Sequence, residues 1–252
     1  MSLSERTNPV FRNTFPALCA TVGFSLESAN IVGYQDYALV KGYNLYSPVF
    51  ESLNETMDIQ ELKIKGEGVT GSGANNISLL DSDGVYQGSY GWWLPDDGTG
   101  EEEGCWFDGD NWCVIEDTVA VGQGFYIFAN DEGLSIQSSG SVKLTAYSKD
   151  LAKGYNLVGN CSPADLDIQQ IKLVGETVTG SGANNICLLD SDGVYQGAYG
   201  WWLPADGTGE EEGCWFDGDN WCMIEDTVAA GQGLYIFAED AGLKLELPCA
   251  IK

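Results

Sequence analysis

Residues 71–133 read GSGANNISLLDSDGVYQGSYGWWLPDDGTGEEEGCWFDGDNWCVIEDTVAVGQGFYIFANDEG, and nearly the same letters return at 180–242. Eight of the 63 positions differ, so 55 are identical. Self-similarity over such a length indicates that one structural unit occurs twice in the chain. The fold is therefore decided within one unit and repeated.

Shorter matches extend the similarity beyond this block. KGYNL at 41–45 returns at 153–157, and DIQ at 58–60 returns at 167–169. The sequence predicts three segments: a leader at 1–29, repeat 1 at 30–143 and repeat 2 at 144–252.

The short apolar runs within each repeat have the pattern of β-strands. FYIFA, GLYIFA and LKLEL are aromatic, β-branched or alternating, and turn signals such as DSDG, DDGTG, DGDN and NDEG separate such runs. The only helix-like stretch, 57–65, is too short and too rich in β-branched residues to predict a helix. We expect an all-β chain of two tandem modules, each of about 110 residues, with antiparallel strands in a sandwich-like or small-barrel arrangement.

The two modules are expected to abut directly. No Gly, Ser or Pro spacer separates Lys143 from Leu144, so the repeats cannot tumble independently. Each copy has its own KGYNL strand, Trp-rich hairpin and YIFA strand, which favours abutment over strand exchange. We expect the shared middle, with its two hairpins, to face solvent. The interface is predicted in the flanks that differ between the copies: 46–57, 134–143, 158–166 and 243–252.

The charge of the chain is strongly negative. Eleven Lys and Arg stand against 38 Asp and Glu, which gives a net charge of -27 over 252 residues. Such a surface repels phosphate backbones and anionic headgroups, so nucleic acid and membrane surfaces are poor partners. The sequence contains no run of 18 apolar residues, so it predicts no transmembrane helix.

The first 29 residues have the outline of a secretory signal peptide. Arg6 and Arg12 precede an apolar stretch at 16–26, and small residues up to Ala29 offer a cleavage site, although Glu27 is unfavourable there. The alternative is an ordinary N-terminal strand or arm. We expect an exported protein that is extracellular or at the cell surface.

The order of motifs resembles a known type of exported β module. An early G-[WY]-N-L strand (GYNL), an acidic DSDGVYQG strand pair, a Trp-rich hairpin and a late G-x-G-[YF] strand (GQGFYIFA) occur in both repeats. ESANIVGYQDYALVKGYNL at 27–45 also resembles the junction of leader and first strand in exported, uncharacterised proteins of verrucomicrobia-like bacteria. The resemblance implies a non-catalytic surface or secreted protein, and it supplies no catalytic residue.

Two cysteines bracket each Trp-rich hairpin. If FDGDN is a five-residue loop, Cys105 lies directly opposite Cys113, within reach of a disulfide. The same pairing is predicted for Cys214 and Cys222; the alternative is small buried thiols. Histidine is absent and no C-x-x-C pair occurs, which disfavours a zinc site. The pairing of the other cysteines stays open: Cys19, Cys161, Cys187 and Cys249.

Pairs of aspartates open one acidic turn in each repeat. Asp81 with Asp83, and Asp190 with Asp192, have the D-x-D-G form seen in calcium loops. An EF-hand requires an acid at its twelfth position, which is Trp92 here, so this is not an EF-hand. Calcium is a candidate cofactor, and turn formation is the alternative role of these residues.

The tryptophans beside carboxylates are candidate sugar-binding residues. Adjacent residues on a strand point to opposite faces, so one of each Trp-Trp pair is expected in the core and the other outside. An exposed indole packs on sugar C–H groups while Asp and Asn bind hydroxyls. The alternative is that the tryptophans fill the cores. The candidates are Trp92, Trp93, Trp112, Asp108 and Asp110, with Trp201, Trp202, Trp221, Asp217 and Asp219 in repeat 2.

The sequence disfavours an enzyme. Without histidine there is no Ser-His or Cys-His machinery, and GSGANN lacks the spacing and the lysine of a phosphate-binding loop. We expect an exported, non-enzymatic structural or adhesive surface protein; the alternative is a secreted carbohydrate-binding, lectin-like protein, with or without calcium dependence. The expected partner is a glycan, another surface protein, or further copies of the chain in a homo-oligomer or polymer.

Overall fold

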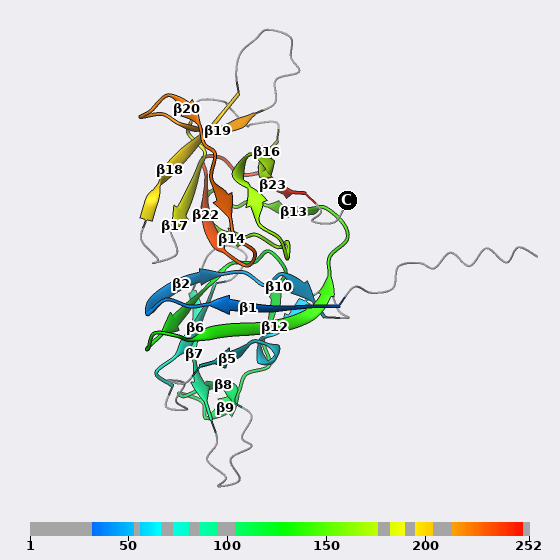
Figure 1. The fold of residues 1–252 in the computed structure, drawn as a ribbon, viewed down its shortest axis with the longest axis vertical. Helices are drawn as coiled ribbons and strands as arrows, with labels where there is room; N and C mark the ends of the chain where they lie inside the picture. Colours follow the sequence, from blue (N-terminus) through cyan, green and yellow to red (C-terminus); the bar gives the residue numbers. More distant parts are fainter. Residues whose placement is uncertain are drawn as a thin grey trace, which may run out of the picture.

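The computed structural model describes residues 32–52, 56–66, 73–80, 86–94, 104–175, 182–189, 195–203 and 213–248. This part of the chain is all-β with antiparallel strands, as predicted, and the two repeats lie end to end along the long axis (Figure 1). None of its helices is long and apolar enough to cross a membrane. The predicted leader and Asp81, Asp83, Asp190 and Asp192 lie outside the described residues.

Repeat 1 contributes twelve of the described strands and one 3-10 helix. They are β1 (Val32–Ala38), β2 (Gly42–Tyr46), β3 (Phe50–Glu51), β4 (Thr56–Asp58), η1 (Ile59–Glu61), β5 (Lys63–Lys65), β6 (Asn76–Leu80), β7 (Tyr86–Trp93), β8 (Cys105–Asp108), β9 (Cys113–Val114), β10 (Thr118–Ala120), β11 (Phe125–Ala129) and β12 (Ser135–Val142).

Repeat 2 has the same order of elements without a counterpart of β3 among its described residues. They are β13 (Tyr147–Asp150), β14 (Gly154–Gly159), β15 (Leu166–Asp167), η2 (Ile168–Gln170), β16 (Lys172–Val174), β17 (Asn185–Leu189), β18 (Tyr195–Trp202), β19 (Cys214–Asp217), β20 (Cys222–Met223), β21 (Thr227–Val228), β22 (Gly233–Ala238) and β23 (Lys244–Leu247).

A six-stranded sheet forms the main layer of each repeat, in the order β2-β11-β6-β7-β8-β9 and β14-β22-β17-β18-β19-β20. Smaller sheets lie on its inner face: β1, β12, β3 and β5 with the β4–β10 pair in repeat 1, and β13-β23-β16 with β15–β21 in repeat 2. Alternate residues such as Ile77, Ile127 and Ile136 fill the core between them. The sheets are open, so the arrangement is sandwich-like, and the small-barrel alternative is not observed.

The KGYNL motif returns because its asparagine closes the turn between two sheets. Asn44 Oδ1 accepts from the N–H of Val40 at 2.9 Å, and its Nδ2 donates to the carbonyls of Val40 at 2.9 Å and Gly42 at 3.1 Å. Asn156 makes the equivalent bonds to Ala152 and Gly154. A buried amide that satisfies several backbone groups fixes the entry into the six-stranded sheet.

The two repeats meet through a pseudo-symmetric pair of backbone contacts. The Ser47 N–H donates to the carbonyl of Gly231 at 2.9 Å, and in the equivalent position the Gly159 N–H donates to the carbonyl of Gly122 at 3.2 Å. Isolated antiparallel bridges lie beside them, Tyr46 with Gln232 and Val158 with Gln123. The ends of β2 and β14 therefore each pair with the GQG turn of the other repeat.

This interface differs in part from the predicted one. Ser47 and Gly159 fall within the predicted flanks, but the GQG turns belong to the shared middle, which was expected to face solvent. Val121, just before the first turn, is buried in the core of repeat 2. Gly122 has φ +79, and a Cβ there would lie 2.5 Å from the Tyr147 ring. Only glycine combines this φ with so close an approach. Every named strand-to-strand ladder joins strands of the same repeat, as abutment predicts, and isolated bridges cross the junction.

We expect Asn44→Ala to lower the free energy of unfolding by about 2–4 kcal/mol, because it leaves partly buried backbone groups of Val40 and Gly42 without their side-chain partner. Urea denaturation measures the change. Asn130→Ala is the matched control, since this exposed side chain bonds only to Asp131 and its loss should stay within about 0.5 kcal/mol. Equal stability of the two variants would contradict the role given to Asn44.

Candidate functional site

Each Trp-rich hairpin ends in a tight four-residue turn. Asp108 pairs with Cys113 across β8 and β9, so the turn is Gly109–Trp112. Trp112 has φ 54 and its side chain is 78% exposed. Trp221 repeats both features, with φ 56 and 77% exposure. A non-glycine residue in the left-handed region is uncommon, and a bulky one that projects into solvent has no packing that explains it.

The carboxylate of Asp108 holds this turn together. It accepts from the N–H of Asp110 at 2.9 Å, the N–H of Asn111 at 3.1 Å and the Nδ2 of Asn111 at 2.6 Å. The side-chain bond from Asn111, followed by the backbone bonds, lowers the pKa of Asp108 below its ordinary value. Asp217 makes the same bonds to Asp219 and Asn220, and its pKa is lowered likewise.

An open hollow lies beside each turn on the outer face of the six-stranded sheet. Its volume is about 330 Å³ in repeat 1 and about 250 Å³ in repeat 2. The first is lined by Gly73, Asn76, Ser89, Gly91, Trp93, Phe107, Asp108, Gly109, Asp110 and Trp112, and the second by Gly182, Asn185, Ala198, Gly200, Trp202, Phe216, Asp217, Gly218, Asp219 and Trp221. Eight of the ten predicted ligand-binding residues thus gather in two equivalent sites.

Three aromatic rings form one wall of the hollow. The Phe107 ring lies between two indoles, with its centroid 6.1 Å from that of Trp93 and 6.1 Å from that of Trp112. Phe216 lies in the same way between Trp202 and Trp221, at 6.0 and 6.1 Å. Phe107 and Phe216 were not among the residues predicted from the sequence. Each directly follows a buried tryptophan on its strand, Trp106 or Trp215, so the alternation of side chains along a strand places it on the outer face.

Two glycines form the floor. Gly91 lies on β7, and a Cβ at this position would come within 2.9 Å of the Cα of Gly73. Gly200 and Gly182 stand in the same relation, at 2.8 Å. A side chain at Gly91 or Gly200 would displace the backbone of the glycine that lies against it, so this part of the lining depends on glycine.

The first tryptophan of each Trp-Trp pair belongs to the core. Trp92 and Trp201 are each 2% exposed and pack edge to face on Trp106 and Trp215, with centroids 4.9 Å apart in both repeats. The prediction that Trp92 and Trp201 contact a ligand is therefore wrong. Their strand neighbours Trp93 and Trp202 remain 42% and 40% exposed, so alternation divides each pair between core and surface.

One glutamine fixes the base of each hairpin. The amide of Gln60, in η1, donates to the carbonyls of Trp106 and Ile115, both at 2.9 Å, and its Oε1 accepts from the Trp106 N–H at 2.9 Å. Gln169 makes the equivalent three bonds to Trp215 and Ile224. This explains the recurrence of DIQ, since Asp58 caps η1, Ile59 is buried and Gln60 holds both strands of the hairpin.

The predicted disulfides are absent from the structure. Cys105, Cys113, Cys214 and Cys222 are free thiols. The prediction assumed a five-residue loop, whereas the turn has four residues and Cys113 lies opposite Asp108. The register places Cys105 and Cys113 at non-opposed positions, so the predicted pairing was wrong. Burial raises the pKa of the Cys105 and Cys214 thiols.

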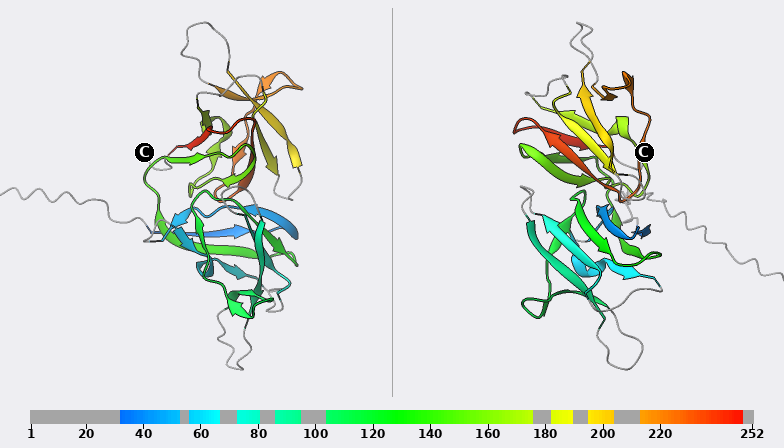
Figure 2. Two further views of the ribbon diagram at one scale, coloured as in Figure 1. Left: turned by 180° about the vertical axis from the view of Figure 1, so that it is seen from behind. Right: turned by 90° about the vertical axis from the view of Figure 1, so that its left-hand side faces the viewer.

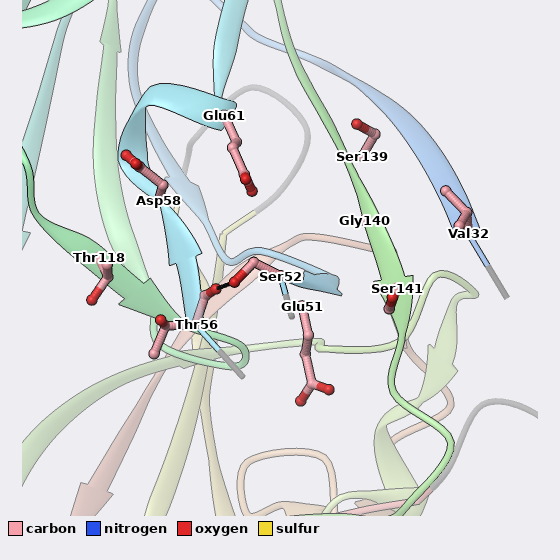
Figure 3. Close-up of a pocket in the computed structure, with 10 residues that line it drawn as sticks. All are labelled: Val32, Glu51, Ser52, Thr56, Asp58, Glu61, Thr118, Ser139, Gly140 and Ser141. Carbon is pink, nitrogen blue, oxygen red and sulfur yellow. Dashed lines mark hydrogen bonds between the residues drawn. The ribbon is translucent and has the colours of Figure 1, made fainter. Parts of the chain in front are cut away.

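Another hollow, of about 470 Å³, lies in repeat 1 between β3, β4, η1 and β12 (Figure 3). Hydroxyl groups and three carboxylates line it, but none of its ten lining residues is aromatic. Figure 3 shows the carboxylates of Asp58 and Glu51 turned away from each other, and Glu51 pairs with Lys143 at 2.5 Å. Among the described residues no three His, Cys, Asp or Glu gather as metal ligands.

The aromatic hollows lie at opposite ends of the molecule. Hairpin β8–β9 is at the lower end of Figure 1 and β19–β20 at the upper end, and both views of Figure 2 show the same separation. Comparison of the chain with protein-family models, with curated proteins and with solved structures gives no match. The function must therefore be inferred from the chemistry of the hollows.

We expect Gln60→Leu to destabilise repeat 1 by about 2–3 kcal/mol, because it removes three hydrogen bonds and leaves backbone groups of Trp106 and Ile115 unpaired. Urea denaturation followed by tryptophan fluorescence measures this. The control is Gln137→Leu, whose amide bonds only to the exposed Asp36 side chain. If both variants unfold at the same urea concentration, Gln60 does not hold the hairpin.

We expect the pKa of Asp108 to rise in Asn111→Ala, since the largest cause of its lowered value is the Asn111 side chain. A lowered pKa means that the ordered turn favours the ionised carboxylate. The ionised Asp108 carboxylate therefore contributes to folding stability above pH 3.8, the ordinary pKa of the group. This contribution is lost as the pH falls through the lowered pKa. Carboxyl NMR titration measures both pKa values, and Asp217 in the same variant is the internal control. An unchanged Asp108 pKa would contradict the turn geometry.

Proposed function

We propose that the protein is a non-enzymatic, carbohydrate-binding adhesive protein with one sugar site at each end. The observation that carries this proposal is the exposed indole of Trp112 and its equivalent Trp221. Each occupies a left-handed backbone conformation and lies beside a hollow lined by two further aromatic rings.

Folding alone does not account for this arrangement. Exposure of an indole gains nothing from apolar burial, and the left-handed conformation costs a non-glycine residue about 1–2 kcal/mol. The Asp108 carboxylate and the Gln60 amide nevertheless hold the turn in this form in repeat 1. Contact with a ligand would supply the missing stabilisation, because a sugar ring can stack on an indole through its C–H face.

The polar groups around the rings suit sugar hydroxyls. Asp110 contributes a carboxylate to the hollow and Asn76 an amide, while Ser89 donates to Asn76 Oδ1 at 3.3 Å. A few polar groups placed around apolar rings are typical of small-molecule sites, where rings provide contact area and polar groups fix orientation.

Two equivalent sites at opposite ends favour adhesion. A molecule with both sites on one rigid body can engage two chains of a polymer, or two places on a surface, so avidity rises without any new contact. Export, the predicted leader and a position at the cell surface belong to this proposal, as does the similarity of the motifs to exported β modules.

We expect Trp112→Ser with Trp221→Ser to abolish binding on a glycan array, and either single change to weaken binding to surfaces while leaving soluble oligosaccharides bound at one end. The control is Tyr34→Ser, which removes a 64% exposed ring of β1 outside the hollows. Retained glycan binding by the double variant would exclude the hollows as the site.

The same glycan-array experiment, repeated with a chelator, tests whether binding depends on calcium. The Asp108 carboxylate is already occupied by Asn111 and backbone N–H groups, so we expect binding in the hollows to persist without divalent cations. Loss of binding with chelator would instead assign recognition to calcium held by the acidic turns at Asp81, Asp83, Asp190 and Asp192.

A further inference from the structure

Six aromatic rings form a continuous band across the junction of the repeats. Centroid distances link Phe128 to Tyr43 at 5.0 Å, Tyr43 to Tyr126 at 6.1 Å and Tyr126 to Tyr235 at 6.3 Å. Tyr235 then contacts Tyr155 at 6.2 Å, and Tyr155 contacts Phe237 at 5.0 Å. The Tyr126–Tyr235 contact crosses between the repeats, so the band belongs to both.

The band lies on the outer face of the sheets and is open to solvent. Tyr43 is 63% exposed and Tyr155 is 65% exposed. Tyr126 and Phe128 are half-buried, whereas the alternate residues Phe125 and Ile127 are buried, so alternation along β11 directs the band away from the core. The core therefore does not explain these rings.

The register of the sheet connects the band to the hollow in repeat 1. Tyr43 pairs with Phe128, Phe128 with Asn76, Asn76 with Gly91, and Gly91 with Phe107. Opposed residues in a sheet share one face, so this is a single row that runs from the junction to the aromatic wall of the hollow.

Repeat 2 has the same row. Tyr155 pairs with Phe237, Phe237 with Asn185, Asn185 with Gly200, and Gly200 with Phe216. Tyr126 and Tyr235 link the two rows, because Tyr126 contacts Tyr43, Tyr235 contacts Tyr155, and the two rings contact each other. Backbone bonds from Ser47 to Gly231 and from Gly159 to Gly122 join the repeats at the same junction. The junction thereby holds both rows in a fixed relation.

We propose that the two hollows and the band form one continuous path for a linear glycan chain of neutral or basic sugars. This inference rests on the proposed function, in which each hollow binds a sugar. It adds that one polymer chain lies along the outer face, with sugars in both hollows and on the rings between them.

A glycan chain suits this path better than other occupants. Along each row two rings are followed by an asparagine and a glycine and then by the ring of the hollow, so apolar faces for sugar stacking are separated by small positions with a polar group. The pseudo-symmetry presents the same rings from either end, which stacking tolerates because both faces of a sugar ring carry C–H groups. The net charge of -27 disfavours chains of uronic acids or sulfated sugars.

Binding of short and long oligomers tests the path. The probes are β-1,4-linked oligomers of glucose, mannose, N-acetylglucosamine and glucosamine, and polygalacturonate is the acidic chain. Each is used at two lengths: about three units, which can fill one hollow, and about twelve units, which can follow the whole path. The test variant is Tyr126→Ser with Tyr235→Ser, and a second variant, Tyr43→Ser with Tyr155→Ser, alters only the most exposed rings. Tyr34→Ser is the control, and thermal unfolding confirms that each variant folds.

We expect at least one neutral or basic sugar to bind about tenfold or more tightly as the long oligomer than as the short one. Both band variants should lose most of that gain and keep the short-oligomer affinity, while Tyr34→Ser keeps both. If short oligomers bind but long ones bind no tighter, or if the band variants keep the gain, the path is wrong and the hollows stand. Tighter binding of polygalacturonate than of every other chain also overturns it. If no oligomer binds at either length, the proposed function itself fails.

Discussion

The two-residue alternation of the six-stranded sheet is the constraint on which both the core and the candidate site depend. On β7 it sends Trp92 inward and Trp93 outward, and on β8 it sends Trp106 inward and Phe107 outward. The inward pair meets edge to face at the centre of the core. A shift of register by one residue would exchange the two sets, so the packing that stabilises the fold also fixes the outer aromatic row.

Buried and half-buried amides explain much of the identity between the two copies. Asn44 closes the turn into β2, Gln60 holds the hairpin base, and Gln123 donates to the carbonyl of Leu80 at 2.8 Å. Asn75 accepts from the N–H of Asn130 at 2.8 Å. Each satisfies backbone groups where a regular ladder ends, so each belongs to the fold. Trp112 and Asp110 are equally shared by the copies but are exposed, and the fold gives no reason for the indole at this position.

The sequence sufficed for the fold class and for the repetition of one unit, because these depend on periodicity and on residue type. Eight of its ten candidate ligand-binding residues line the hollows, but six of the ten residues that line each hollow were not predicted. It did not predict the hairpin register. The choice between a four- and a five-residue turn depends on the left-handed conformation of Trp112, which residue preferences argue against. That single turn places Cys113 opposite Asp108 and not opposite Cys105. The junction was predicted only in part, since the close approach of Gly122 to Tyr147 is a contact between distant segments.

Some of the differences between the copies fall on the outer face, and one of them, Ser89 against Ala198, makes the two hollows chemically unequal. Ser78 and Ser89 of repeat 1 are replaced by Cys187 and Ala198 in repeat 2. In repeat 1 the Ser89 hydroxyl donates to Asn76 Oδ1 at 3.3 Å, which orients this amide within the hollow. In repeat 2 the corresponding Asn185 donates through Nδ2 to the carbonyl of Ala183 at 3.0 Å.

Both hollows keep the same three rings, so ring stacking is common to the two ends and hydroxyl recognition is not. The rings stack on sugar faces of many kinds, whereas the orientation of an amide selects which hydroxyl is bound. Affinity for a sugar is therefore set by groups that the copies share, and preference between sugars by groups in which they differ. A glycan chain that occupies both hollows would contact the same aromatic rings at each end but different polar groups. The aromatic rings are pseudo-symmetric, so the polar groups alone would set the direction in which the glycan chain binds.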